Sequence, residues 1–592
     1  MMAKPFPSVF RLSLFLSILI LIAGCGGGSG GGGTKGGGEE MSDPVILHQP
    51  ADKTVPLNVQ ADFSVSVVGE GLTFQWQRSD DSGTTWNPIS GATTAFYSIA
   101  SAEKMTASFR CIVTNTTGSV TSDAAEFAVV TVAFVSKDVW GGGDGTDWGK
   151  AYPSLDDALN NAPADSEIWV AKGTYTPGPD RGSTFTLKAG VGVYGGFAGS
   201  ETCREARDWE ENETILSGDI DGNDSTADPA SNANNSYHVV TCVDVDGAIL
   251  DGFIITAGNA DGITPRDCGG GMYIENSSPV LTDCAFSGNA ARFEGGAMYN
   301  EASGPVITGC TFAENSAPYG GGMINYDSAP TLTDCTFTNN SSLQSGGGML
   351  NRDGSCPTLA DCTFSGNSAA NEGGGMCNEG QSSPTLTGCT FSGNAAGSNG
   401  GAISCHEYSN PVMVRCKISE NTASSRGGGM YVSNCGPLGE LVIANCVFSG
   451  NSASSGGGIC ASSSTPILLN CTVVNNSAEN LGGGMYNCDE GISTLTNCII
   501  WGNMATDYPR QISDDGESPY TVAYSCLQGC KTQSNNIPDD PLLNDDLTLQ
   551  AESPCIDAGD SSAVDEEMDI DLAGNPRISG TAVDMGAYEY QQ

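Results

Sequence analysis

Basic residues are scarce in this sequence. Lysine and arginine together number 23 against 69 acidic residues, so the formal net charge of the 592-residue chain is −46. A surface with this charge repels nucleic acid and anionic lipid, so neither is expected as a partner. It suits divalent cations or a crowded extracellular setting.

Helical periodicity and long apolar runs are also missing. Apolar residues at i, i+3, i+4 and i+7 never continue long enough to predict an extended helix. The apolar run from Leu12 to Ile22 is too short to span a bilayer, and no later segment is long enough. No Cys-x-x-Cys pair or Cys/His set has the spacing of a zinc site, and Cys405-His406 alone is a weak signal.

The short apolar run has the properties of a signal peptide. It follows Lys4 and Arg11 and ends in Leu21-Ile-Ala-Gly-Cys25, which resembles the lipobox of bacterial lipoproteins. The resemblance implies removal of residues 1–24, lipidation of Cys25 and, since no Asp follows, location in the outer membrane. The alternative is an ordinary signal peptide with a chance cysteine. Residues 25–42 are glycine-rich and predict a flexible tether.

Nine copies of a paired motif occupy residues 268–503, in steps of 25 to 30 residues. One copy reads Cys362-Thr-Phe-Ser-Gly-Asn367 and then Gly373-Gly-Gly-Met376. A fixed period of this size predicts a solenoid, in which each unit buries its apolar face against its neighbours. The cysteine of the motif recurs at Cys284, Cys310, Cys335, Cys362, Cys389, Cys416, Cys446, Cys471 and Cys498. The asparagine recurs at Asn289, Asn315, Asn340, Asn367, Asn394, Asn421, Asn451, Asn476 and Asn503.

The residues of the motif select a parallel β-helix. Cys-x-Phe alternates with period two, so cysteine and phenylalanine point inward together. About 26 residues make one coil of two or three strands, and coils stack about 4.8 Å apart. We therefore expect a stack of buried, reduced cysteines, with disulfides between stacked neighbours as the alternative, and a ladder of asparagine amides bonded from coil to coil. The fold class is all-β. A threonine column, Thr311, Thr336, Thr363 and Thr390, is explained by β propensity rather than by ice or glycan binding.

The paired motifs resemble the repeats of chlamydial polymorphic outer-membrane proteins and related bacterial surface β-helices. Residues 134–267, with Trp140 to Trp148 and Ser154 to Leu159, resemble the opening of pectate-lyase-like β-helices, which implies a short capping helix followed by irregular coils. Residues 504–592 contain Asp571 to Arg577 and Val583 to Tyr590, and resemble the choice-of-anchor Q domain.

Residues 43–133 predict a small β-sandwich. Alternation at 63–67, 74–77 and 109–113 suits strands B, C and F of an immunoglobulin-like domain, with Trp76 in the core and Cys111 on strand F. Strand B has no partner cysteine, so no disulfide between the sheets is expected. We expect a spacer, with weak carbohydrate or protein binding as the alternative.

Two sets of residues are candidates for chemistry. Asp219, Asp221, Asn223 and Asp224 place oxygen ligands at alternate positions, so calcium is possible, although a solvated acidic loop remains open. A carboxylate column follows the glycine motifs: Glu275, Glu301, Asp327, Asp353, Glu379, Glu407 and Asp489. Polysaccharide lyases with the pectate-lyase-like fold hold calcium with carboxylates from successive coils and use Arg or Lys as a base. Asp327, Asp353 and Glu379 with Arg352, and His406 nearby, are the set that resembles this arrangement; a solvated turn face is the alternative.

These observations favour a cell-surface β-helix anchored in the outer membrane that binds a polysaccharide or the surface of a host or neighbouring cell without catalysis. A polysaccharide lyase or hydrolase is the second hypothesis, and a passive envelope component is the third. No cofactor is expected apart from the possible calcium.

Overall fold

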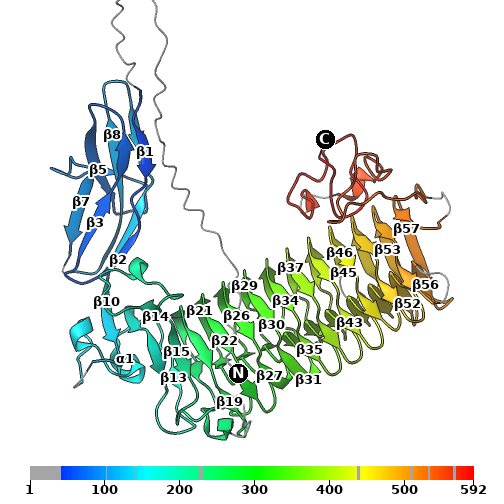
Figure 1. Cartoon of the computed structure of the whole chain (residues 1–592), viewed down its shortest axis with the longest axis horizontal. Helices are drawn as coiled ribbons and strands as arrows, with labels where there is room; N and C mark the ends of the chain where they lie inside the picture. Colours follow the sequence, from blue (N-terminus) through cyan, green and yellow to red (C-terminus); the bar gives the residue numbers. More distant parts are fainter. Residues whose placement is uncertain are drawn as a thin grey trace, which may run out of the picture.

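The computed structural model describes residues 42–591 except 102, 140–141, 226–230, 437–440, 507–510, 531–533 and 565–567. Cys25 lies outside the described residues, so its lipidation stays a prediction. Within the described ranges, no helix is both long and apolar enough to cross a membrane. The architecture is an N-terminal sandwich, a long parallel β-helix and a C-terminal lobe, shown in blue, cyan to orange, and red in Figure 1.

The sandwich consists of ten strands around an aromatic core. They are β1 (Val45–His48), β2 (Lys53–Pro56), β3 (Gln60–Ser64), β4 (Ser66–Val68), β5 (Thr73–Ser79), β6 (Asn87–Pro88), β7 (Phe96–Ala100), β8 (Met105–Thr114), β9 (Ser119–Thr121) and β10 (Ala125–Val135). Trp76 and Cys111 are paired across β5 and β8 and are fully buried, as predicted. Cys111 is free, so this core has no disulfide through it. Aromatic packing holds the two sheets instead, with the Phe63 and Phe109 ring centroids 5.0 Å apart.

Strand β10 joins the sandwich to the β-helix without a break. Its first half pairs antiparallel with β8, and Thr131–Val135 pair in parallel with Ser166–Val170 of the first coil. The domain boundary predicted between residues 133 and 134 therefore falls inside a strand. The apolar run Phe127–Val135 contains no glycine, proline, asparagine or aspartate that would end the strand.

Helix α1 (Leu155–Asn161) closes the open end of the first coil, as predicted. The Ser154 hydroxyl accepts a hydrogen bond from the Asp156 backbone amide and so caps the helix N-terminus. Leu155, Ala158 and Leu159 are buried in the main core. The cap protects the edge of the solenoid from pairing with another chain.

Short 3-10 turns occur at η1 (Trp148–Lys150), η2 (Arg204–Ala206), η3 (Ser231–Asn234) and η4 (Ser561–Ala563).

Each coil of the right-handed β-helix contributes to as many as four parallel sheets, more than the two or three strands expected. Sheet 1 contains β11 (Ser166–Ala171), β14 (Val191–Phe197), β17 (Asp246–Asp251), β21 (Ser278–Thr282), β25 (Val306–Thr308), β29 (Thr331–Thr333), β33 (Thr358–Ala360), β37 (Thr385–Thr387), β41 (Val412–Val414), β45 (Leu441–Ala444), β49 (Pro466–Leu469), β53 (Ser493–Thr496) and β57 (Tyr520–Ala523). Sheet 2 contains β12 (Gly173–Tyr175), β15 (Thr214–Ser217), β18 (Ile254–Thr256), β22 (Ala285–Ser287), β26 (Thr311–Ala313), β30 (Thr336–Thr338), β34 (Thr363–Ser365), β38 (Thr390–Ser392), β42 (Lys417–Ser419), β46 (Val447–Ser449), β50 (Thr472–Val474), β54 (Ile499–Trp501) and β58 (Cys526–Leu527).

The other two sheets complete the coil. Sheet 3 contains β19 (Asn259–Ala260), β23 (Ala290–Ala291), β27 (Ser316–Tyr319), β31 (Ser341–Ser345), β35 (Ser368–Ala369), β39 (Ala395–Ala396), β43 (Thr422–Ala423), β47 (Ser452–Ala453), β51 (Ser477–Ala478) and β55 (Met504–Ala505). Sheet 4 contains β13 (Phe185–Thr186), β16 (Val240–Val243), β20 (Met272–Glu275), β24 (Met298–Glu301), β28 (Met323–Tyr326), β32 (Met349–Arg352), β36 (Met376–Asn378), β40 (Ile403–Cys405), β44 (Met430–Ser433), β48 (Ile459–Ser462), β52 (Met485–Cys488) and β56 (Ile512–Asp514).

The predicted ladders fill the core. All nine cysteines of the motif are buried and free, and Phe337 stacks between Phe312 and Phe364 with centroids 4.6 Å apart on both sides. The nine asparagines are buried and bond in series; the Asn367 amide nitrogen donates to Asn394 Oδ1 over 2.9 Å. The glycine motif supplies the sharp corner before sheet 4. Gly373 has φ 64°, and a Cβ there would lie 2.7 Å from the Cys377 Cβ.

A second asparagine ladder runs through sheet 4. It joins Asn300, Asn325, Asn351 and Asn378 by amide hydrogen bonds of 2.7 to 2.8 Å and ends on Cys405 Sγ. The signal for it was present in the sequence, because each of these asparagines is the second residue after the methionine of a glycine motif.

The β-helix continues past the predicted end of the repeats at residue 503, to Leu527 in β58. The rest of the chain forms a lobe that rises from the last coils (Figure 1). Val447, Val474 and Ile499, which face outward from sheet 2, are buried in the clusters that attach this lobe. Earlier coils have threonine or serine at most of these outward positions.

Candidate functional site

The structure divides the predicted carboxylate column into two. Glu275 and Glu301 end strands of sheet 4, whereas Asp327 and Asp353 lie one residue further on, in turns with φ 47° and 52°. The spacing in the sequence explains this difference: Glu301 is three residues after Met298, and Asp327 is four residues after Met323. Glu407 and Asp489 also belong to the turn column, with φ 52° and 53°. The carboxylate column that the sequence predicted as continuous is therefore two shorter sets, one at strand ends and one in turns.

Arg352 is held by two carboxylates on the outer face of sheet 4. Its Nε lies 2.5 Å from Glu379 Oε1, its Nη1 lies 2.9 Å from Glu294 Oε1, and its guanidinium is 5.0 Å from the centre of the Tyr319 ring. Burial favours loss of the Arg352 proton, but Glu379 and Glu294 outweigh it and raise the pKa of the guanidinium. An arginine must lose its proton to act as a base, so this arrangement opposes that role.

Only part of the predicted lyase set comes together. Arg352 and Glu379 form a pair, and Asp353 instead accepts a hydrogen bond from the Tyr326 hydroxyl, which raises the pKa of Tyr326. Glu294, the second partner of Arg352, was missed by the sequence analysis. It lies 58 residues before Arg352, just ahead of a glycine motif, and becomes a neighbour only through the stacking of coils.

The other two bases of this face are also paired. His406 Nε2 lies 2.5 Å from Glu372 Oε2 and 2.7 Å from Ser404 Oγ. Burial works against the charged form of Glu372, yet the hydrogen bond from His406 lowers its pKa overall. Arg426 lies 3.4 Å from Asp489. The His406–Glu372 pair joins adjacent coils, and the Arg426–Asp489 pair joins coils two apart, so the charged side chains of this face connect coils to one another.

The predicted calcium ligands form a self-contained loop. Asp219 accepts hydrogen bonds from the backbone amides of Asn223 and Asp224, and Asp221 Oδ2 accepts one from Asn223 Nδ2 at 2.8 Å. Asp224 Oδ2 accepts one from Asn235 Nδ2. Across the described ranges, no group of three or more His, Cys, Asp or Glu side chains is arranged to hold a metal. Calcium at this loop stays a prediction.

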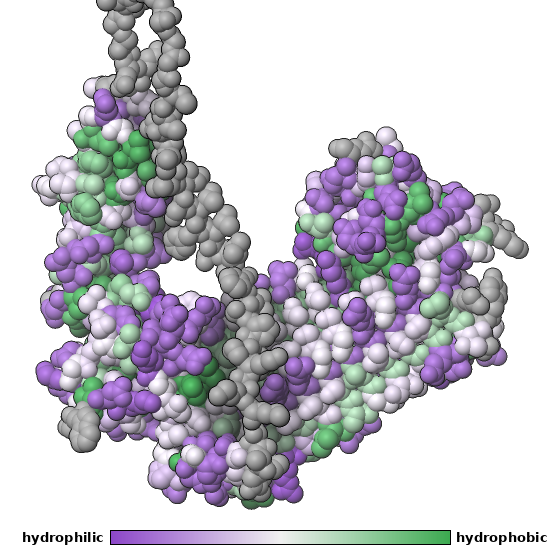
Figure 2. Space-filling view, in the orientation of Figure 1, coloured by the Kyte–Doolittle hydropathy of each residue, from purple (hydrophilic) through white to green (hydrophobic). Residues whose placement is uncertain are grey.

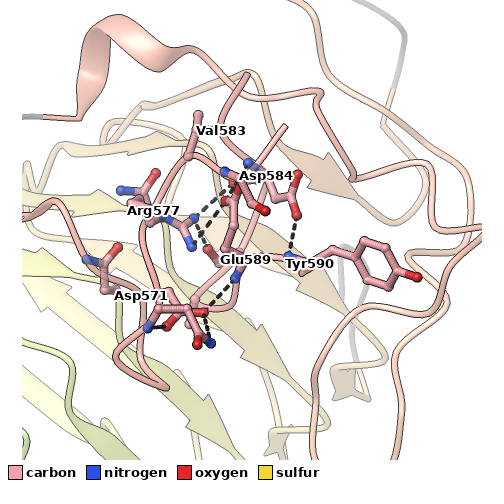
Figure 3. Close-up of polar contacts among 12 residues, drawn as sticks. Asp571, Arg577, Val583, Asp584, Glu589 and Tyr590 are labelled. Carbon is pink, nitrogen blue, oxygen red and sulfur yellow. Dashed lines mark hydrogen bonds and ion pairs between the residues drawn. The ribbon is translucent and has the colours of Figure 1, made fainter. Parts of the chain in front are cut away.

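The C-terminal lobe is organised by a buried arginine (Figure 3). Arg577 is 1% exposed and donates to the backbone oxygens of Asp584 and Gly586. The carboxylates of Asp571, Asp584 and Glu589 each accept hydrogen bonds from backbone amides of the lobe. Burial raises the pKa of Glu589 to about 7. These contacts explain why the motifs at 571–577 and 583–590 contain an arginine and several carboxylates. Because these side chains are buried, their role is structural.

The surface between the sandwich and the lobe is open. In Figure 2 both bodies rise from the solenoid, and the molecule is hollowed between them. We call "the saddle" the outward residues of four strands of sheet 1 and four of sheet 2 in this region: Val306, Thr308, Thr331, Thr333, Thr358, Ala360, Thr385 and Thr387, with Thr311, Ala313, Thr336, Thr338, Thr363, Ser365, Thr390 and Ser392. All are at least partly exposed, and all are uncharged. The threonine column, which β propensity alone explained as a single column, is thus one of several parallel columns of hydroxyl-bearing residues that together form a surface.

Both bodies beside the saddle are firmly attached. The sandwich is joined through β10, and the Thr54 backbone amide donates to Glu205 of the solenoid over 2.8 Å. At the other end, the Asn497 side chain donates to the Asp560 backbone oxygen over 3.1 Å, and the Ala587 amide donates to Thr472 Oγ1 over 2.9 Å. A surface fixed at both ends needs no rearrangement to bind an extended ligand.

Two family models match parts of the chain that correspond to the sandwich and the β-helix. A domain of unknown function (DUF8696) matches residues 51–133. No curated protein matches the chain. Among solved structures, a family 28 exopolygalacturonase of Yersinia enterocolitica is similar at 10% identity and a TM-score of 0.24, covering 81% of this chain and 99% of that one. The model described as "Right handed beta helix region" matches residues 232–391, 324–472 and 371–536, just over half of the chain, and the protein belongs to this family.

Proposed function

We propose that this protein is a non-catalytic polysaccharide-binding protein of the bacterial cell surface, and that the polysaccharide lies along the saddle. The saddle itself is the observation that supports this proposal. Its outward strand residues are uncharged and rich in hydroxyl groups, the exposed Asp334 and Asp361 stand at the corner between its two sheets, and the pattern repeats every coil, about 4.8 Å apart. Threonine offers a hydroxyl that both donates and accepts, next to a methyl group, which suits the mixed polar and apolar faces of sugars.

The chemistry of sheet 4 favours binding over catalysis. The arginine that resembled a lyase base has two carboxylate partners. The fold resembles that of polysaccharide-active enzymes, but a fold by itself does not specify a reaction. A lyase or hydrolase is therefore the second candidate. A passive envelope component is the third.

Attachment to the outer membrane belongs to the same proposal. Lipidation of Cys25 and the glycine-rich segment after it would hold the sandwich away from the membrane, with the saddle accessible to polysaccharide. The net charge of −46 makes nucleic acid an unsuitable ligand.

A glycan array tests the proposal. The probe is the full chain carrying Cys25→Ser, which cannot be acylated and can be purified without detergent. We expect binding to polysaccharide fragments and loss of binding in Thr336→Arg, which places a large charge in the saddle. The matched control is Leu343→Arg in the next strand of the chain, on sheet 3, where Leu343 is 70% exposed. Absence of any glycan signal, or equal loss in both variants, would refute binding at the saddle.

A further inference from the structure

A depression of about 430 Å³ opens at the sandwich end of the saddle. It is lined by Tyr194, Arg204, Glu205, Arg207, Trp209, Ile249, Asp251, Val280 and Thr282. Val280 and Thr282 pair in register with Val306 and Thr308, so the floor of the depression continues into the saddle. Its volume lies within the range of small-ligand sites, roughly 300–1,000 Å³.

Trp209 forms an exposed aromatic wall that the backbone holds in place. Its side chain is 39% exposed. A Cβ at Gly196, which has φ 86°, would lie 2.7 Å from Trp209 Cα, and one at Gly252 would lie 3.3 Å from Trp209 Cβ. The Asp208 amide donates to the Gly196 oxygen over 2.9 Å, and Asp208 Oδ1 accepts from the Glu210 amide. Two glycines thus allow the Trp209 backbone and Cβ to lie directly against the sheet, which fixes the position from which the indole projects.

The charges around Trp209 are compensated within the protein. Arg207 Nη2 lies 2.6 Å from Asp251 Oδ1 and its guanidinium is 5.2 Å from the Trp209 ring centre. Arg204 Nη1 lies 2.6 Å from Glu167 Oε1. Each arginine already has a carboxylate partner, so the depression offers no free positive charge to a uronate or a sulfate. What remains for a ligand is an aromatic face, an apolar floor of Ile249 and Val280, and polar groups at the rim.

We propose that this depression binds the end of a neutral polysaccharide, with one sugar ring packed against Trp209. The inference rests on the proposed function, because the same chain would continue along the saddle. Aromatic rings bury large apolar area, and the C–H faces of a neutral sugar match such a ring, while the exposed Glu205 carboxylate at the rim accepts hydrogen bonds from its hydroxyl groups.

Calorimetry with defined hexasaccharides tests this site. The probes are cellohexaose, xylohexaose and mannohexaose as neutral chains and hexagalacturonate as the anionic chain, each titrated into the full chain carrying Cys25→Ser. Trp209→Ala should weaken binding of a neutral probe about tenfold or more, the loss expected for an aromatic anchor. Trp209→Phe should retain part of the affinity. The control is Phe293→Ala, which removes a 47% exposed aromatic ring just before the Glu294 bridge, away from sheet 1.

The outcomes separate the two proposals. If neutral probes bind and Trp209→Ala binds as tightly as the parent protein, the inferred subsite is wrong and binding along the saddle stands. Preferential binding of hexagalacturonate would overturn the neutral specificity. If the parent protein binds none of the probes and no glycan on the array, the proposed function fails and the subsite with it.

Discussion

Asn394→Leu removes one step from the middle of the main asparagine ladder. Asn394 is fully buried. Its Oδ1 accepts from the backbone and side-chain nitrogens of Asn367 at 3.0 and 2.9 Å, and its Nδ2 donates to the Phe364 oxygen and to Asn421 Oδ1, both at 2.9 Å. Leucine has a similar branched shape but no polar atoms, so the substitution tests these bonds more than packing.

The expected cost follows from the groups left behind. The Phe364 carbonyl and the Asn367 amide both lose this partner inside the core, where an unsatisfied polar group costs about 1–3 kcal/mol. We therefore expect Asn394→Leu to lower the free energy of unfolding by about 2–6 kcal/mol. Asn289 begins the ladder, and its Oδ1 accepts only from the Gly258 amide, at 2.9 Å. Asn289→Leu should thus be milder than Asn394→Leu by about one hydrogen bond, 0.5–1.5 kcal/mol.

Urea unfolding followed by circular dichroism measures the total effect, and hydrogen exchange locates it. Exchange should increase first in the coils on either side of residue 394, because repeats contact mainly their neighbours. Asn480→Leu is the control, since Asn480 is exposed and its side chain bonds only to Ser454 Oγ. If Asn394→Leu unfolds at the same urea concentration as Asn480→Leu, the ladder contributes no net stability and the reasoning fails.

Three further predictions concern the anchor, the paired arginine and the lobe. Cys25→Ser should move the protein from the membrane fraction to the soluble fraction, and continued sedimentation with membranes would show another anchor. Arg352→Ala leaves Glu294 and Glu379 without their positively charged partner, so it should lower the free energy of unfolding. The loss should lie between that of an exposed ion pair, about 1 kcal/mol, and that of a buried pair, about 3–5 kcal/mol. Neither the parent protein nor this variant should form an ultraviolet-absorbing unsaturated product from pectate or alginate with calcium; product lost on substitution would restore the lyase hypothesis. Glu589 has a pKa raised to about 7 from 4.5, so the folded lobe binds a proton more tightly than the unfolded chain and its stability should fall as pH rises through this interval. Glu589→Gln should flatten that dependence in hydrogen exchange of the lobe, and an unchanged slope would contradict the assignment.

The features that repeat were predictable from the sequence, and those that join distant coils were not. Period and alternation were enough to predict the cysteine and asparagine ladders, because each residue meets its own copy in the next coil. Arg352 meets Glu294 across two coils, and the two residues occupy different positions of the repeat, so no shared column marks the pair. The depression at Trp209 was equally hidden, since its walls come from a loop and three strands with no shared motif. The outward apolar residues Val447 and Ile499 did carry a signal for the lobe, as departures from the threonine pattern.

Strand β10 gives the molecule a defined mechanical response. A load carried by the tether enters the described structure at Ser42 and reaches the solenoid by way of β10. Pulling along this strand would shear its hydrogen bonds to β8, β2 and β11 together rather than open them one after another. The sandwich and the solenoid would therefore resist separation under tension, and, if Cys25 is lipidated as proposed, force applied to the solenoid would reach the membrane through β10.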